Sequence, residues 1–225
     1  MSIYINFYNI LPTGRAFISD TSNREFPPWI LKLQKGQRIS LSKENQGLSK
    51  IMVGLGWDEV KQTGGFFSGL FKAQDIDCDA FALLLKDGKL KSRQDIVFFN
   101  HLEHATGAVK HMGDNLTGAG EGDDEQIFID LDRVPAEYTS IVLAVNIYQA
   151  YDRHQHFGMI ENAFIRLVDA LTNNEMCIYN LSENYNNKIA MLFGEVYRKN
   201  GEWKFRAIGE GSGESSITEF AKRFE

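Results

Sequence analysis

Two short acidic segments carry the side chains of this sequence that are best suited to chemistry. Residues 75–79 read Asp-Ile-Asp-Cys-Asp, and residues 113–125 form a glycine-rich stretch that ends in Asp-Asp-Glu. Each segment comes directly before an apolar run. Aspartate, asparagine and glycine also form ordinary solvated turns, so the informative feature is the density of carboxylates.

The consecutive carboxylates at residues 123–125 predict a bound cation. Two carboxylates held about 4 Å apart near a protein surface repel each other by roughly 4 kcal/mol at an effective dielectric constant near 20. A free loop relieves this repulsion by flexing, but residues 123–125 lead straight into an expected strand. A cation bound at this point would remove the repulsion.

The ligand types favour calcium. Hard oxygen ligands without an obligatory histidine or cysteine indicate calcium or magnesium rather than zinc. Calcium takes about six to eight oxygens, including backbone carbonyls that a glycine-rich loop presents readily, whereas magnesium keeps several waters. Residues 75–79 match the start of an EF-hand loop, but Ala80 and Lys86 stand where that motif needs glycine and glutamate. The sequence therefore predicts a loop site outside the EF-hand class.

Histidines give a weaker indication of zinc. The spacings that suggest it are His101-x-x-His104 and His154-x-His156, with His111 between them. A zinc site needs a complete set of four ligands, which the sequence does not supply. Surface or core histidines are the preferred interpretation.

Catalytic groups are also weakly indicated. An acid–base cluster could be drawn from Asp152, Arg153 and His154, but no nucleophile motif such as G-x-S-x-G accompanies these residues. A loop between strands explains the three residues equally well. The chain is therefore predicted not to be an enzyme.

Short β-strands are the elements expected to position these loops. The apolar runs are short and rich in β-branched and aromatic residues, and residues 203–208 alternate with Lys204 and Arg206 on a solvated face. Turn signals occur at residues 87–88, 173–174 and 200–201, and Asn200-Gly201 is a strong hairpin signal. Many short strands with this spacing predict an all-β fold, an antiparallel β-sandwich.

A short C-terminal helix is expected to close the sandwich. Ser216 and Glu219 form a predicted capping box, and Ile217, Phe220 and Phe224 share one helical face that would dock on the sheet. The composition changes near Pro27-Pro28. We therefore predict an N-terminal extension over residues 1–36 and a single sandwich domain over residues 37–225.

The overall composition excludes several classes of protein. The 225 residues are 43% hydrophobic and 24% charged, which suits a globular core. A formal net charge of -6 disfavours nucleic acid as a partner. Cys78 and Cys177 lie in apolar stretches and are expected to be buried and reduced. No signal peptide and no apolar run of roughly 20 residues is evident, which predicts a cytoplasmic protein that does not span the membrane.

Several motifs resemble those of the TerD family of tellurium-resistance and stress-response proteins. The similarity spans roughly residues 38–212, and the acidic loop is its most specific feature. The matching segments are residues 53–58, 75–81, 113–125, 153–158, 163–168, 190–198 and 201–209.

The resemblance implies a bacterial, cytoplasmic, calcium-binding β-sandwich that acts in resistance to tellurite and other stresses. It also implies two neighbouring calcium ions and partners among other Ter-type proteins, including a membrane-embedded one. The implied side-chain ligands are Asp75, Asp77, Asp114, Asn115, Asp123, Asp124 and Glu125. Gly118 and Gly122 are expected to contribute carbonyl oxygens.

The sequence departs from the family pattern at three places. Asp79 stands where a small residue such as serine is usual, which suggests an additional ligand or an altered affinity. Glu121 stands where aspartate is common, and its role is left open. The first 36 residues have no counterpart in the shortest members of the family.

Three functions remain open on the sequence alone. The first is a calcium-binding stress-response module whose loop surface is recognised by protein partners. The second is a calcium-dependent lipid-binding sandwich, which the acidic loops suit less well because they lack an exposed apolar tip and a basic face. The third is a metal-dependent hydrolase that uses the same carboxylates around an open coordination position.

Overall fold

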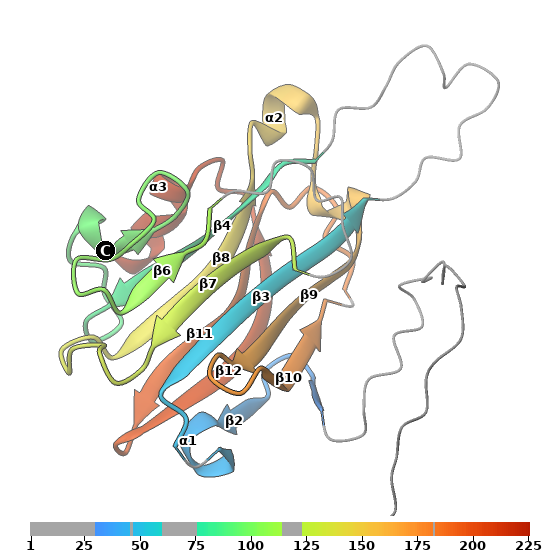
Figure 1. The fold of residues 1–225 in the computed structure, drawn as a ribbon. Coiled ribbons are helices and arrows are strands. Elements are labelled where there is room, and N and C mark those ends of the chain that lie inside the picture. The colour runs from blue at the N-terminus through green and yellow to red at the C-terminus, as the bar shows by residue number, and fades with distance from the viewer. Residues whose placement is uncertain (1–29, 46, 60–75, 114–122, 182) are drawn as a thin grey trace, which may run out of the picture.

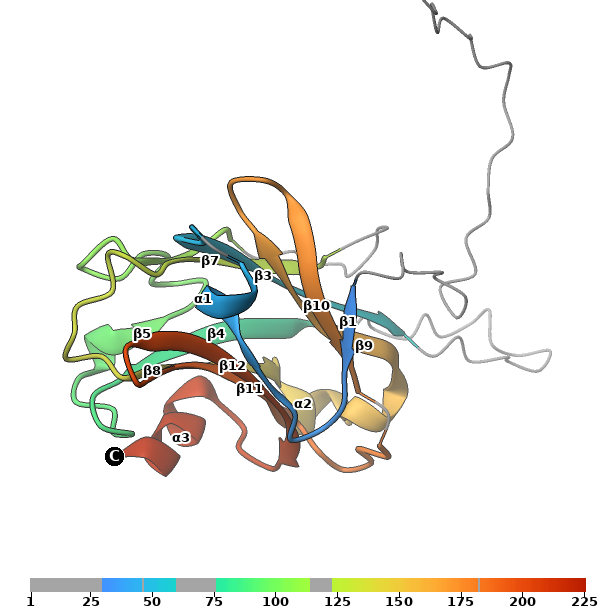
Figure 2. The same cartoon turned by 90° about the horizontal axis from the view of Figure 1, so that it is seen from below.

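The computed structural model describes residues 30–45, 47–59, 76–113, 123–181 and 183–225. In these ranges the chain forms two six-stranded β-sheets that pack face to face (Figures 1 and 2). The predicted all-β sandwich is confirmed.

The first sheet, sheet A, carries the end of the acidic loop. Its strands in spatial order are β1 (Leu31–Leu33), β10 (Asn174–Asn180), β9 (Ile160–Asp169), β3 (Lys50–Glu59), β7 (Glu125–Asp130) and β6 (Val109–His111). The pairings are antiparallel except for β1 with β10, which is parallel. Strand β1 falls inside the segment predicted to be an extension and forms an edge of this sheet. Residues 1–29 lie outside the described residues, so the domain boundary stays a prediction.

The second sheet, sheet B, is antiparallel throughout its described pairings. Its strands in spatial order are β2 (Arg38–Ser40), β12 (Glu202–Ser212), β11 (Ala190–Lys199), β8 (Ser140–Ile147), β4 (Cys78–Leu85) and β5 (Ile96–Val97). The β11–β12 hairpin turns at Asn200 (φ 56°) and Gly201 (φ 75°). Two consecutive residues with positive φ match the turn that the Asn-Gly signal predicts.

Short helices connect or cover the sheets. They are α1 (Leu41–Glu44), α2 (Ala150–Arg153) and α3 (Ile217–Ala221), with 3-10 turns η3 (Arg93–Asp95), η4 (Phe157–Met159) and η5 (Lys222–Phe224). Helix α3 is the predicted C-terminal helix, and the Glu219 N–H donates to Ser216 Oγ at 3.2 Å. The Glu219 carboxylate accepts from Ser215 at 2.8 Å, so this half of the capping box is shifted by one residue.

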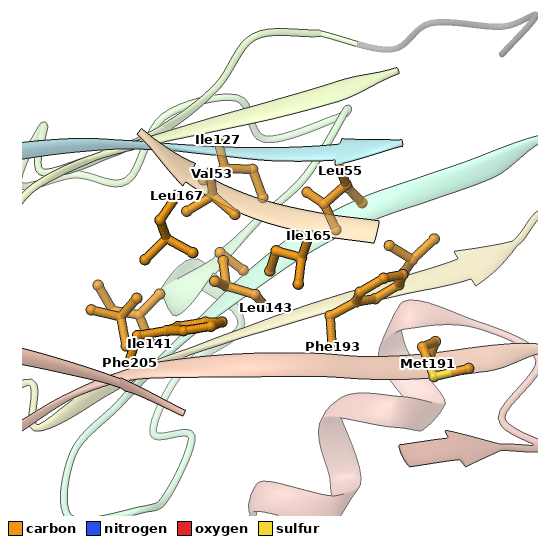
Figure 3. Close-up of a cluster of buried hydrophobic side chains, with 14 of the residues drawn as sticks. Val53, Leu55, Ile127, Ile141, Leu143, Ile165, Leu167, Met191, Phe193 and Phe205 are labelled. Atoms are coloured by element: carbon orange, nitrogen blue, oxygen red, sulfur yellow. The ribbon is translucent and has the colours of Figure 1, made fainter. Parts of the chain in front are cut away.

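The main core lies between the two sheets, where the inward side chains of both sheets meet. Leu55 and Ile165 from sheet A face Leu143 and Phe193 from sheet B (Figure 3). Each of these four side chains is at most 1% exposed. The core occupies the inner face of each sheet, which leaves the outer faces and the strand ends for functional residues.

A second apolar cluster covers the outer face of sheet B. Phe81 of β4 meets Phe220 of α3 in an edge-to-face contact with ring centroids 5.2 Å apart. Because both faces of β4 are covered, every residue of this strand is buried. Figure 2 shows α2 and α3 on this same outer side of the sheet.

Both cysteines are free and buried, as predicted. Burial raises the pKa of the Cys177 thiol to about 12, so almost none of it is thiolate near neutral pH. We expect native protein at about pH 8 to resist iodoacetamide at Cys177, and unfolded protein to react there and at Cys78. Mass spectrometry of tryptic peptides measures both states. Rapid native labelling of Cys177 would contradict the buried position of this strand.

Candidate functional site

Both acidic segments adjoin the same end of the sandwich. Leu55 of β3 pairs with Glu125, the first residue of β7. The side chain of His111, the last residue of β6, reaches the start of β4 in the other sheet. Its Nε2 lies 3.1 Å from the carbonyl oxygen of Ala80. Asp77 immediately precedes β4 and therefore belongs to this end as well. The predicted ligands outside the described residues are Asp75, Asp114, Asn115, Gly118 and Gly122.

Asp123 lies on the outer face of sheet A, over strand β3. Its carboxylate accepts two hydrogen bonds from Arg166 of β9, at 2.6 and 2.9 Å, and one from Gln126 Nε2 at 3.1 Å. Gly54 makes this position possible, because a Cβ built at Gly54 would lie 2.3 Å from Asp123 Cγ. Arg166 also bonds Glu175 Oε2 at 2.9 Å. Asp123 is thus held by a bidentate ion pair on the outer surface of the sheet.

Asp124 occupies the position where the β3–β7 pairing ends. Its backbone N–H donates to Leu55 O at 2.8 Å, and its Oδ2 accepts from the Trp57 N–H at 2.8 Å. The pairing of β3 with β9 shifts register between Gly56 and Asp58, so Trp57 sits in a bulge. The carboxylate therefore satisfies a backbone donor in the bulge that marks the mouth of the loop.

The environment of Asp124 favours its neutral form. Burial raises the pKa of this carboxyl from its usual value near 3.8 to about 6, although the Trp57 N–H acts in the lowering direction. Three nearby carboxylates add to the increase: Asp58, Asp123 and Glu125. Negative charge is therefore crowded at this point of the described structure, and a cation would relieve it.

Glu125 points into the sandwich on the same face as its strand partner Leu55. Its Oε2 lies 3.0 Å from Nε2 of His111, and both side chains are about 1% exposed. The Gly113 N–H donates to His111 Nδ1 at 3.1 Å, which places the proton of a neutral ring on Nε2. The Met112 N–H donates to Gln126 O at 3.0 Å. These contacts hold the two ends of the acidic loop together.

The first acidic segment divides between two environments. Asp77 O accepts from the Tyr148 N–H at 2.8 Å, and its Oδ2 lies 3.7 Å from Arg153 Nη1. Asp79 pairs with Asn146 of β8 and lies on the outer face of sheet B, among the residues that line a cavity. Cys78 and Ala80, the residues on either side of Asp79, face the main core. The structure therefore places Asp79 on a different face of the sandwich from Asp123 and Glu125.

Sequence reasoning missed three residues of this region. They are Arg166 and Asp58, to which sequence reasoning assigns no role, and His111, which it treats as a core or surface histidine. A charge alternating with apolar neighbours on β9 was the only signal for Arg166. Arg166 and Asp123 meet over Gly54 because of the strand register, which cannot be read from the sequence.

Comparison with known proteins decides the family. Residues 30–224 match the TerD domain family. This chain belongs to the TerD family. It is 49% identical over 196 residues to stress response protein SCP2 of Bacillus subtilis (strain 168), covering 86% of this chain and 98% of the relative. It is 46% identical over 182 residues to tellurium resistance protein TerD of Serratia marcescens, covering 80% and 90%.

Solved structures with the same fold include TerD-type proteins. A homologue of the telluride resistance protein from Streptomyces coelicolor A3(2) superposes with a TM-score of 0.55 at 20% identity, covering 78% of this chain and 96% of that one. A protein of unknown function, SAV2460, superposes with a TM-score of 0.60 at 23% identity and the same coverage. These likenesses establish the fold. None of the helices in the described ranges is long and apolar enough to cross a membrane.

The donor chemistry of the TerD loop fits a hard cation. Asp124 supplies a buried carboxylate whose neighbours are themselves acidic, and such a site favours calcium-type ions over soft metals. Within the described residues, no three side chains of His, Cys, Asp or Glu are grouped closely enough to hold an ion. A complete set of ligands for a cation would therefore have to include residues outside the described ranges.

We predict that Gly54→Ala destabilises the metal-free protein by about 1–3 kcal/mol. The added methyl group would displace the Asp123 carboxylate from Arg166, and overpacking of this kind typically costs that amount. Urea unfolding in the presence of chelator measures the effect. Gly213→Ala is the matched control, because a Cβ at Gly213 meets nothing within 4 Å. Equal stability of the two variants would contradict the close approach over Gly54.

We also predict an unusual pH dependence for Asp124. A carboxyl group whose pKa is higher in the folded state than in the unfolded state does not affect stability below about pH 4. As the pH rises from about 4 to about 6, it progressively lowers the free energy of unfolding. Asp124→Asn retains an acceptor for the Trp57 N–H without the charge. Metal-free Asp124→Asn should therefore be more stable than the wild type by about 1–3 kcal/mol above pH 6. At about pH 4 the two should converge, as thermal unfolding in chelator would measure.

Proposed function

We propose that this TerD-family protein is a calcium-binding, non-enzymatic stress-response module that acts through protein partners. The observation that carries the proposal is Asp124, a buried carboxylate among other acidic groups at the mouth of the acidic loop. The names of its relatives, a stress response protein and a tellurium resistance protein, support the physiological part of the proposal.

In this proposal, Asp124 and Asp77 are the ligands at the described ends of the two acidic segments. The predicted residues outside the described ranges complete the set: Asp75, Asp114, Asn115, Gly118 and Gly122. Bound calcium supplies the positive charge that offsets the carboxylate repulsion at the loop mouth. Two ions are proposed, with Asp123 and Glu125 beside them.

The chain's own contacts would give the loop a fixed base. Arg166 holds Asp123 on the sheet, while His111 and Glu125 join the strands on either side of the loop. Ordering the loop on this base would create a surface for a partner to recognise. We propose other Ter-type proteins as those partners, one of them membrane-embedded, and a cytoplasmic location. The net charge of -6 disfavours nucleic acid.

Calcium titration of chelator-treated protein tests the proposal. At a free calcium concentration 100 times its dissociation constant, each independent site should stabilise the fold by about 2.7 kcal/mol. We expect thermal unfolding to shift upward with calcium and little with magnesium, and calorimetry to give the stoichiometry. No shift and no heat of binding would reject calcium binding by this protein.

Substitutions separate ligands from supporting residues. Asp124→Asn should reduce the calcium-induced shift, even though it stabilises the metal-free fold. Asp123→Asn should lower stability with and without calcium, because it weakens the partly buried ion pair with Arg166. Asp132→Asn, at an exposed turn, serves as the control and should leave both quantities unchanged. A full calcium response in Asp124→Asn would refute its assignment as a ligand.

A further inference from the structure

A cavity of about 680 Å³ lies on the outer face of sheet B. Residues of β4, β8, α2 and the start of α3 line it, together with the segment around β5. Figure 2 shows that α2 and α3 both lie on this side of sheet B. Small-molecule sites commonly have volumes of about 300–1,000 Å³, so the size suits an organic ligand.

The cavity has a polar floor. Asp79 and Asn146 are cross-strand partners, and both line the cavity although they are only 7% and 4% exposed. The Oδ1 atom of Asn146 is buried and has no hydrogen-bond partner among the described residues. A buried acceptor of this kind is costly unless a donor reaches it. The floor thus presents a carboxylate and an amide oxygen, both of which accept hydrogen bonds.

Aromatic side chains supply much of the cavity wall. Phe98, Phe99, Tyr148 and Tyr151 all line it. The guanidinium of Arg153 lies 5.0 Å from the centre of the Tyr148 ring, so a cation already stacks on one of these rings. Aromatic faces attract cations, and the attraction strengthens when the cation is shielded from water.

The charge of the lining is also acidic. Among the described residues of the lining, Asp79, Asp152 and Arg93 carry formal charges, which sum to -1. Arg93 is exposed, whereas Asp79 is buried at the floor. A positively charged donor therefore complements the floor better than a neutral or anionic group does.

We propose that this cavity binds a small organic cation, whose ammonium or guanidinium group donates to Asp79 and Asn146 while its apolar part packs against the aromatic wall. The proposal gives Asp79 a role in this cavity in place of a role as a metal ligand. It does not depend on calcium binding, because Asp123, Asp124 and Glu125 adjoin sheet A, whereas Asp79 lies on the outer face of sheet B.

Protein NMR on the full chain in chelator tests the proposal. The probes are phenethylammonium, neutral 2-phenylethanol and anionic phenylacetate, which share one ring and a similar length. We expect phenethylammonium to shift the amide signals of Asp79, Asn146 and α3, with a dissociation constant about tenfold lower than that of 2-phenylethanol. Phenylacetate should bind more weakly than both. Equal affinity of the three probes, or no shift at these residues, would overturn the proposal.

Three variants make the test specific. Asp79→Asn should bring phenethylammonium to within about twofold of the neutral probe, because it removes the charge-assisted hydrogen bond. Asp87→Asn, at an exposed turn that follows the same strand, is the matched control and should keep the preference. Thr218→Trp, on the exposed rim, should block all probes without altering the floor, and so it tests the location even if Asp79→Asn folds poorly.

Calcium provides the final discrimination. Asp79→Asn should retain the calcium-induced shift in thermal unfolding if Asp79 belongs to the cavity. Loss of that shift would return Asp79 to the metal centre and overturn its assignment here. A preference for phenethylammonium that survives in Asp79→Asn would equally contradict the proposed floor.

Discussion

The bidentate ion pair between Arg166 and Asp123 fixes how the acidic loop joins the sandwich. Removing two charges from water is costly, and their attraction offsets this cost only when the geometry is good and the remaining polar atoms are satisfied. Here Arg166 donates twice, and Gln126 supplies a third donor to Asp123. The absent side chain of Gly54 leaves the space in which the pair forms.

This anchor sets the directions of the two residues that follow. Asp124 is left at the end of the β3–β7 pairing, where its carboxylate meets the backbone of the Trp57 bulge. Glu125 then enters the strand and faces the interior beside His111. Three consecutive carboxylates thus have three separate surroundings. Asp124, the one at the mouth of the loop, lacks a cationic side-chain partner in the interactions described above and has a raised pKa.

Much of the fold could be predicted from the sequence because its strands keep a simple period. In β12, buried and half-buried residues alternate from Glu202 to Gly209, and the Asn200-Gly201 turn has the expected positive φ values. Strand β4 was harder, since both of its faces are covered and no alternation remains. The confirmed helix α3 is what covers its outer face.

The candidate site could be predicted only in part, because contacts between strands depend on register. The acidic residues can be recognised from the sequence alone. The contact between Arg166 and Asp123 depends instead on the pairing of Gly54 with both neighbouring strands. The direction of Asp79 required knowledge of which face of β4 is the main core. Asp77, Asp79 and their neighbours look like one cluster in the sequence, and a strand separates them by turning adjacent residues to opposite faces.

Strand β4 relates the proposed metal centre to the proposed cavity, since Asp77 and Asp79 flank a single residue, Cys78. Coupling between two sites requires an element with two arrangements that both ligands bias. Strand β4 pairs with β8 along its whole length, and Cys78 is packed in the core at 2% exposure. Continuous pairing and a packed core residue resist a second arrangement of this strand, so we expect its two ligands to bind independently. The closeness of Asp77 and Asp79 in the sequence therefore implies neither a common ligand nor communication between the two sites.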